Sequence, residues 1–293
     1  MKNIAFIINP VAGTLNKRRI PKAIDALLSH EQWTPDIVFT EYKGHATELA
    51  AQYAQMEFDA VVAVGGDGTV SEVAAGLRDT GTALGILPVG SGNGLARHLN
   101  IPLRLPRAIE MLNRSESVSV DYALLNGRPF FCTCGTDFDA LVSEHFASAG
   151  KRGMKTYLQQ IVKDIFQYTP QHCTIKGDGV DIETDAFLVT IANANQWGNA
   201  AYIAPQASIQ DGLLDVAVLS PFPILAVPGL VMELFTKTLD KGLFMNTVRT
   251  RELTVTRPAP APFHCDGDPV EVDTTAHIRV VPDGLRVLVE RRF

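Results

Sequence analysis

One segment of the chain, Val64-Gly-Gly-Asp-Gly-Thr-Val-Ser-Glu72, carries the residue types that bind phosphate groups. It follows a continuous apolar run and precedes a run with helical apolar spacing, which predicts a loop at the carboxyl end of a buried strand. Consecutive glycines let backbone N–H groups approach a polyphosphate, and a helix N-terminus favours negative charge. Thr69 and Glu72 fit a capping box at the start of that helix. Asp67 would repel a bare phosphate unless it holds magnesium, acts through water or is protonated.

Two further loops follow predicted strands in the same way. Ile8–Gly13 closes the first strand, and Leu87–Arg97 ends a later strand and opens a helix. Three polar, glycine-bearing loops at one edge of one sheet are explained together by a phosphate-rich ligand. The simpler alternative is three ordinary tight turns, with Asp67 as a turn residue.

Several well-known motifs are absent from these loops. The glycines of the Leu87–Arg97 loop miss the dinucleotide-binding spacing because Leu95 occupies the third glycine position. Val89 stands where a nucleophile elbow needs glycine, so Ser91 is not expected to attack a carbonyl. Walker-type and protein-kinase motifs are also missing, which leaves a phosphate site of another kind.

The elements that position these loops indicate an α/β domain over residues 1–120. Continuous apolar strands that alternate with helices are typical of a parallel sheet with helices on both faces. The predicted strands are Ile4–Ile8, Asp36–Thr40, Ala60–Val64 and Leu84–Pro88, and the predicted helices are Ile20–Leu28, Ala46–Met56 and Val70–Leu77.

Residues 121–293 have a different pattern, with short β-prone runs separated by turn residues. Asn126-Gly127 lies between two such runs and predicts a hairpin, and Asp283-Gly284 predicts another turn. The pattern favours a β-rich, sandwich-like domain. Helical insertions are expected at about Asp139–Tyr168 and Ile224–Leu239.

Composition limits the kind of protein. A net charge of −6 argues against nucleic acid as a partner. The apolar stretch Phe222–Phe235 is shorter than the ~20 residues that span a bilayer, so it is expected in a buried helix or against lipid. Four scattered cysteines (Cys132, Cys134, Cys173, Cys265) indicate a reducing compartment. We therefore expect a cytoplasmic protein that is soluble or peripheral to a membrane.

The ordered motifs resemble those of the diacylglycerol kinase catalytic family, which includes soluble bacterial lipid kinases and sphingosine kinases. The resemblance rests on Asn9-Pro-x-Ala-Gly13, Gly65-Gly-Asp-Gly-Thr69 and Leu87-Pro-x-Gly-Ser-Gly-Asn93. Asp211-Gly-Leu-Leu-Asp215 and Cys265-Asp-Gly-Asp268 extend it over nearly the whole chain.

The resemblance implies an ATP-dependent lipid kinase of phospholipid metabolism. The γ-phosphate of ATP would pass to the hydroxyl of a diacylglycerol or sphingoid-base lipid in a cleft between the two domains, with Mg²⁺ as cofactor. The residues that would contact ATP by matching motifs are Asn9, Pro10, Val11, Ala12, Gly13, Thr40, Gly66, Asp67, Gly68, Thr69, Val70, Ser71, Glu72 and Ser91.

The family's bacterial members also imply a magnesium site in the second domain. Its counterparts here are the backbone carbonyls of Ser208 and Leu213 and the carboxylate of Asp211. Such a sparse oxygen set suits Mg²⁺, which keeps several waters. A hairpin turn before the following strand is the alternative.

The predicted general base departs from the family pattern. Bacterial relatives usually carry Asp-Gly-Glu, whereas the third residue here is Asp268, one methylene shorter. Catalytic geometry is sensitive to a change of that size. We rank Asp268 first as the base and Asp67 second, as in sphingosine kinases, with Asp266 orienting water or metal. A plain turn at Asp266–Asp268 is the alternative.

Two other functions remain open from the sequence. One is an NAD-kinase-like phosphotransferase on a soluble nucleotide, and the other is a lipid or nucleotide sensor without catalysis. The expected partner is a lipid at a membrane surface, and a homodimer is left open.

Overall fold

The computed structural model describes all residues except 14–18, 139–164, 166–167 and 291–293. The contacts divide the chain into two compact units. Unit 1 comprises Met1–Tyr122, Gly198–Ala200 and the chain from Pro282, and unit 2 comprises Ala123–Trp197 and Ala201–Val281. The chain passes between the units within strands β5 (Ser115–Leu125) and β16 (Thr275–Glu290).

Unit 1 is an α/β domain with a parallel sheet in the order β2-β1-β3-β4, and β16 pairs in parallel with β4 through Val287 and Leu84. Every residue of β3 and β4 is buried, as continuous apolar strands predict. The strands are β1 (Lys2–Ile8), β2 (Trp33–Phe39), β3 (Ala60–Gly65) and β4 (Ala83–Pro88).

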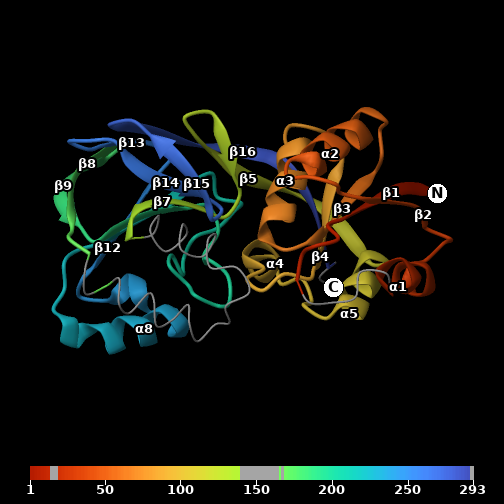
Figure 1. Ribbon diagram of the computed structural model, residues 1–293, viewed down its shortest axis with the longest axis horizontal. Coiled ribbons are helices and arrows are strands. Elements are labelled where there is room, and N and C mark those ends of the chain that lie inside the picture. Colours follow the sequence, from red (N-terminus) through yellow and green to blue (C-terminus); the bar gives the residue numbers. More distant parts are fainter. Residues whose placement is uncertain (14–18, 139–164, 166–167, 291–293) are drawn as a thin grey trace. The chain divides into compact units, whose positions relative to one another are not determined.

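Two layers of helices cover this sheet. Helix α2 packs on α3, and α1 packs on α5, with one pair on each side of the sheet in Figure 1. The helices are α1 (Ile20–Leu27), α2 (His45–Gln55), α3 (Asp67–Leu77), α4 (Gly94–His98) and α5 (Leu105–Leu112). The predicted parallel sheet with helices on both faces is therefore confirmed.

Unit 2 is an antiparallel β-sandwich. One sheet has the order β12-β11-β10-β7-β14-β15, and the other joins the first half of β16 to β13, β8 and β9. A hairpin of β5 and β6 turns at Asn126 and Gly127, which both have positive φ, as the Asn-Gly pair predicts. The remaining strands are β6 (Arg128–Phe130), β7 (Thr133–Asp137), β8 (Gln171–Gly177), β9 (Val180–Ala186), β10 (Leu188–Ala192), β11 (Leu214–Leu219), β12 (Met245–Thr250), β13 (Glu252–Thr256), β14 (Ala261–Cys265) and β15 (Asp268–Val272).

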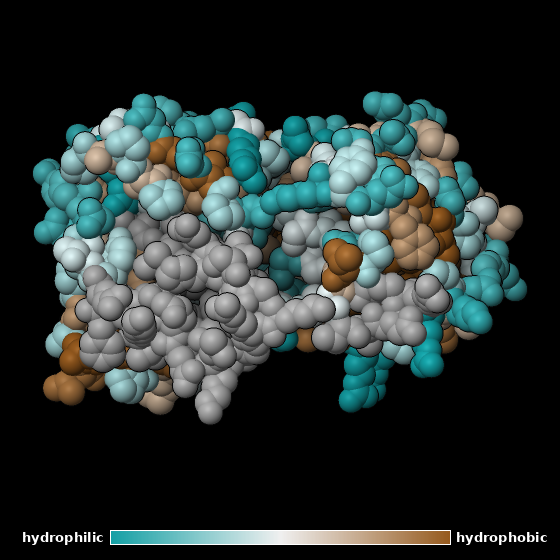
Figure 2. All heavy atoms as spheres, viewed as in Figure 1, coloured by the Kyte–Doolittle hydropathy of each residue, from teal (hydrophilic) through white to brown (hydrophobic). Residues whose placement is uncertain are grey.

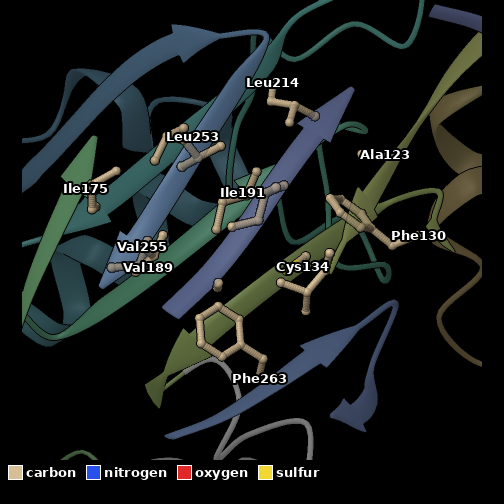
Figure 3. Packing of buried hydrophobic residues seen from close by; sticks show 14 of the residues in the cluster. Ala123, Phe130, Cys134, Ile175, Val189, Ile191, Leu214, Leu253, Val255 and Phe263 are labelled. Atoms are coloured by element: carbon tan, nitrogen blue, oxygen red, sulfur yellow. The ribbon is translucent and has the colours of Figure 1, made fainter. Parts of the chain in front are cut away.

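Alternation along the central strands builds a core on each face of the six-stranded sheet. Val189 and Ile191 of β10 belong to the cluster between the two sheets, where β10 and β11 meet β8 and β13 (Figure 3). Leu188 and Ala192 point to the opposite face and belong to a second cluster. Because the side-chain period of a strand is two, a single strand serves both cores.

One prediction about the second half is wrong. Asp283-Gly284 does not separate two strands, because β16 continues through it with Asp283 at a φ of 54°. The helical insertion at Ile224–Leu239 is confirmed as the 3-10 turn η2 (Ile224–Ala226), helix α8 (Val227–Thr236) and the 3-10 turn η3 (Leu239–Lys241). The insertion predicted at Asp139–Tyr168 falls mostly outside the described residues.

Candidate functional site

The three glycine-bearing loops of unit 1 touch one another. A Cβ atom on Gly13 would overlap the carbonyl oxygen of Val89, and one on Gly90 would overlap the Cα of Gly66. Gly13 also has a φ of 62°, which favours glycine. Only residues without side chains allow this backbone approach, so the loops after β1, β3 and β4 form one continuous backbone surface.

Asn9 ties the first loop to the second. Its amide Nδ2 donates to Thr69 Oγ1 at 3.0 Å, and its Oδ1 accepts the N–H of Val11 at 3.0 Å. The backbone N–H of Asn9 donates to the carbonyl of Val64 at 3.1 Å. Pro10 and Val11 are exposed, and the Val11 side chain is 85% exposed. The loop is thus anchored at Asn9 and open to solvent at its tip.

Helix α3 begins at Asp67, and no side chain caps it. The predicted capping box is wrong, because Gly66 is the N-cap and Thr69 already lies in the first turn. Glu72 does not reach back to the helix start but accepts the N–H of Gly44 at 3.0 Å, which fixes the start of α2. The first turn of α3 therefore presents its N-terminus without a competing side-chain cap, the arrangement that favours an anion.

Asp67 holds the third loop in place. Its Oδ2 accepts the N–H of Asn93 at 2.8 Å, and its Oδ1 accepts the N–H of Gly94 at 2.6 Å. A Cβ on Gly92 would lie 2.6 Å from Oδ2, so the loop packs closely on the carboxylate. Burial raises the pKa of Asp67, although these two N–H groups and the charge of Arg97 lower it. Asp67 is a positioning group in this geometry.

The other predicted ATP contacts differ in exposure. Thr40 is buried just after β2, where its N–H donates to the Ile8 carbonyl at 3.0 Å, and Val70 is buried in the core. Gly68 and Ser91 are exposed, and Ser71 is half-buried. The structure thus brings Asn9, Gly13, Gly66, Thr69 and the Ser91 loop together, while Val70 can offer a ligand no more than its backbone.

Asp266 and Gly267 form the two-residue turn between β14 and β15, and both have positive φ. The Asp266 carboxylate accepts the N–H groups of Phe131, Cys132 and Thr133 at 2.9, 2.7 and 3.2 Å. Three backbone donors on one carboxylate fix the segment between β6 and β7. Asp266 therefore has a structural role beyond the predicted orientation of water or metal.

Asp268 is the first residue of β15, and its side chain is 44% exposed. Its Oδ2 lies 3.7 Å from Nη2 of Arg128, at the start of β6. Arg128 was not predicted from the sequence, although the Asn126-Gly127 hairpin places it on the strand directly after the turn. The structure thus brings Asp268 together with Arg128 in unit 2, whereas Asp67 belongs to unit 1.

The predicted magnesium residues form two successive turns before β11. The N–H of Gln210 donates to Ser208 Oγ at 3.3 Å, and the N–H of Leu213 donates to Asp211 Oδ1 at 3.1 Å. Asp211 is exposed, and Ser208 and Leu213 are half-buried. One carboxylate and two backbone carbonyls are hard oxygen donors, so this set fits Mg²⁺ with water completing its shell. Among the described residues, no group of three or more His, Cys, Asp and Glu could hold a metal.

A cavity of about 310 Å³ lies next to these turns in unit 2, and no sequence pattern predicted it. Asp215 on β11 lines it, paired with Arg249 through Oδ1 and Nε at 3.1 Å. Burial raises the pKa of Asp215, and Arg249 lowers it. Its Oδ2 is buried without a hydrogen-bond partner in the described structure. The lining residues are Ala204, Pro205, Gln206, Asp215, Asp240, Thr247 and Arg249.

Comparisons with known proteins agree with both units. The model of the diacylglycerol kinase catalytic domain matches residues 3–125, and that of the YegS C-terminal NAD kinase beta sandwich-like domain matches residues 133–289. A "Probable lipid kinase YegS-like" of Yersinia enterocolitica is 27% identical over 266 residues, covering 88% of each chain. Its Yersinia pestis counterpart is 28% identical over 264 residues, covering 87% of each.

Solved structures share the fold. A diacylglycerol kinase from Bacillus anthracis superposes with a TM-score of 0.78 at 21% identity, covering 98% of this chain and 96% of that one. A further structure from the same organism gives a TM-score of 0.80 at 24% identity, covering 99% of each chain. With both domain models matched in order and the glycine loops in contact, the chain belongs to the diacylglycerol kinase catalytic family and is a lipid kinase of the YegS-like type.

Proposed function

We propose that this lipid kinase transfers the γ-phosphate of ATP to the hydroxyl of a diacylglycerol or sphingoid-base lipid. The observation that carries the proposal is the mutual contact of three glycine loops around the uncapped N-terminus of α3. Backbone N–H groups and a helix N-terminus at one place form a phosphate cradle. Phosphoryl transfer depends mainly on such positioning and on charge neutralisation.

Asp268 is the proposed general base. The proton of the lipid hydroxyl passes to its carboxylate, the freed oxygen bonds to the γ-phosphorus, and the bond to the β-phosphate oxygen breaks to release ADP. Its side chain is 44% exposed, whereas both carboxylate oxygens of Asp67 accept backbone N–H groups of the third loop. This difference supports ranking Asp268 before Asp67, and Arg128 orients the Asp268 carboxylate.

Ser208, Asp211 and Leu213 would hold a magnesium ion in unit 2, and Mg²⁺ bound with ATP would offset the phosphate charge. We further propose a cytoplasmic, peripheral enzyme of phospholipid metabolism. Two observations support this placement. In the described structure none of the four cysteines forms a disulfide, which suits a reducing compartment. In the described part of the chain, no helix has the length and apolar character needed to cross a membrane.

The test is transfer of label from [γ-³²P]ATP to diacylglycerol, monoacylglycerol, sphingosine or ceramide in mixed micelles, with NAD as a soluble control. We expect one lipid to be labelled. Asp268→Asn should lower turnover by roughly 10²–10⁴-fold, as loss of a general base does. Asp273→Asn, an exposed carboxylate at the other end of the same hairpin, is the matched control and should leave turnover unchanged.

The other results have defined meanings. Label in NAD alone would replace the lipid substrate with a soluble nucleotide. ATP binding by calorimetry without any transfer would indicate a sensor. Wild-type turnover in Asp268→Asn would return the base role to Asp67 or to water.

A further inference from the structure

Large apolar side chains are exposed over one short segment of unit 2. Of the twelve exposed large hydrophobic residues in the described structure, six fall between Ile224 and Leu243. We call these six the α8 surface, and Figure 2 shows some brown spheres at the lower left edge of the view, where α8 lies in Figure 1. Leu225 and Leu243 are the most exposed, at 89% and 90%. The α8 surface consists of Ile224, Leu225, Val231, Met232, Phe235 and Leu243.

Helix α8 is apolar on both of its sides. Leu230 and Leu234 pack against the second core cluster of unit 2, which accounts for the inner side. Val231, Met232 and Phe235 lie on the outer side and are 46%, 64% and 50% exposed. A surface helix of a globular domain normally carries polar residues there, so the outer side of α8 is suited to an apolar environment.

The acidic and basic side chains of this segment differ in their exposure to solvent. Glu233 is the one charged residue of α8, and its Oε2 is buried close to the backbone of Gly242. Oδ1 of Asp240 is buried as well. Lys237 and Lys241 are exposed, and Nζ of Lys237 lies 4.3 Å from the ring centroid of Tyr202. Acidic oxygens turn inward and ammonium groups stay outside, which complements a negatively charged partner.

We propose that the α8 surface is the membrane-docking face of this enzyme and that it binds bilayers rich in anionic phospholipid. The six apolar side chains enter the boundary between head groups and acyl chains, and the two lysines meet lipid phosphates. The inference rests on the proposed function, since a kinase of bilayer lipids must reach the bilayer.

The dimensions fit a helix that lies on the membrane. Helix α8 has 10 residues, which at ~1.5 Å per residue is about half of the ~30 Å hydrocarbon core. Its exposed residues also extend beyond the helix, to Leu225 before it and Leu243 after it. An apolar patch that includes flanking turns favours contact with a surface over burial of a single helix in a groove.

The experiment is sedimentation of the full chain with vesicles of phosphatidylcholine, with or without phosphatidylglycerol. We expect binding to the mixed vesicles and an affinity about tenfold lower for Met232→Gln and for Leu225→Gln. Met56→Gln is the matched control, because Met56 is 65% exposed in unit 1 against 64% for Met232. It should bind like the wild type.

Lysine variants separate the electrostatic part from the apolar part. Lys237→Gln with Lys241→Gln should remove most of the preference for phosphatidylglycerol, while weak binding to neutral vesicles persists. Because all of these residues are exposed, thermal unfolding should match the wild type and exclude misfolding as the cause of lost binding.

Three results would overturn the inference. Wild-type vesicle affinity in both Met232→Gln and Leu225→Gln would show that docking does not use the α8 surface. A loss of affinity in Met56→Gln as large as theirs would show the same. A lipid-independent dimer in light scattering that the apolar variants abolish would assign the surface to a second copy of this chain. Transfer to dispersed short-chain lipid is measured in parallel, so a failed kinase reaction with retained vesicle binding would count against the proposed function alone.

Discussion

Asp67 and Asp266 are carboxylates that the fold uses in the same way, as acceptors for backbone N–H groups in a neighbouring loop. The Asp67 carboxylate accepts hydrogen bonds from the N–H groups of Asn93 and Gly94. The Asp266 carboxylate accepts them from the three N–H groups of Phe131–Thr133. Hydrogen bonds to a charged acceptor contribute about 1.5–3 kcal/mol each. Acidic residues in a phosphate-binding motif can therefore serve to shape the loop rather than to act on the ligand.

The raised pKa of Asp67 makes stability depend on pH in a defined direction. Because burial raises the folded-state pKa, the folded chain holds a proton that the unfolded chain has released. The free energy of unfolding should therefore fall as pH rises from about 3.9, the unfolded value, up to the folded pKa, and then level off. The measurement is urea unfolding of wild type and Asp67→Asn across this range.

The difference in the free energy of unfolding between wild type and Asp67→Asn isolates Asp67, since all other groups titrate in both proteins. As pH rises from about 3.9 to the folded pKa of Asp67, the wild type should lose stability relative to the variant. Asp25→Asn, an exposed aspartate whose side chain is 82% exposed, should follow the wild type throughout. A difference that is constant with pH would mean that the pKa of Asp67 is not raised.

At the scale of elements, the proposed phosphate cradle depends on the glycines at which two loops cross and not on glycines elsewhere in the unit. Gly66 and Gly90 meet backbone to backbone, while Gly81 has no heavy atom near its Cβ position. Gly66 and Gly90 set how closely the loops after β3 and β4 approach each other. Gly81 has room for a side chain.

Gly90→Ala should abolish ATP binding and lower the melting temperature, because the added methyl overlaps the Cα of Gly66 and separates the two loops. Gly81→Ala should be neutral or slightly stabilising, since a methyl there meets open space and reduces the entropy of the unfolded chain. Calorimetric titration with ATP and thermal unfolding measure both. Wild-type ATP affinity in Gly90→Ala would show that the two loops do not need this contact.

The sequence predicts unit 1 better than unit 2 because its signals are local. Continuous apolar runs identify β1, β3 and β4, and parallel order places their loops at one edge. Strand β14 was missed because it begins within a proline-rich run, Pro258–Pro262, which is atypical of a strand. The backbone partners of Asp67 and Asp266 could not be predicted, since they depend on loops closing in three dimensions.

On the scale of the whole molecule, β16 is the strand that both units need. Its first half pairs with β13 in unit 2, and its second half pairs with β4 in unit 1. In unit 1 the N–H of Asp283 donates to Asp121 Oδ1 at 2.9 Å, and the Gly284 carbonyl accepts the N–H of Asp79. The last described residues of the chain are thus part of the unit that the first residues form.

Two alanine substitutions at buried positions of β16 should therefore destabilise different units. Leu285→Ala and Ile278→Ala each remove a side chain that is 1% exposed, at an expected cost of about 2–5 kcal/mol. Amide hydrogen exchange should accelerate in β1, β3 and β4 for Leu285→Ala, and in β8 and β13 for Ile278→Ala. Equal acceleration in all five strands for both variants would mean that the units unfold as one.

The path of β16 also orders events during synthesis. Domains emerging from a ribosome generally fold from the N-terminus as soon as they are complete. Here the sheet with the glycine loops lacks the partner of β4 on one side until Val287 has been made, although Met1–Tyr122 is translated first. The sandwich of unit 2 holds the early half of β16 and can close before that point. The unit that is translated first is therefore completed only after unit 2 has been made. Until then the buried strand β4 has a partner strand on one side only.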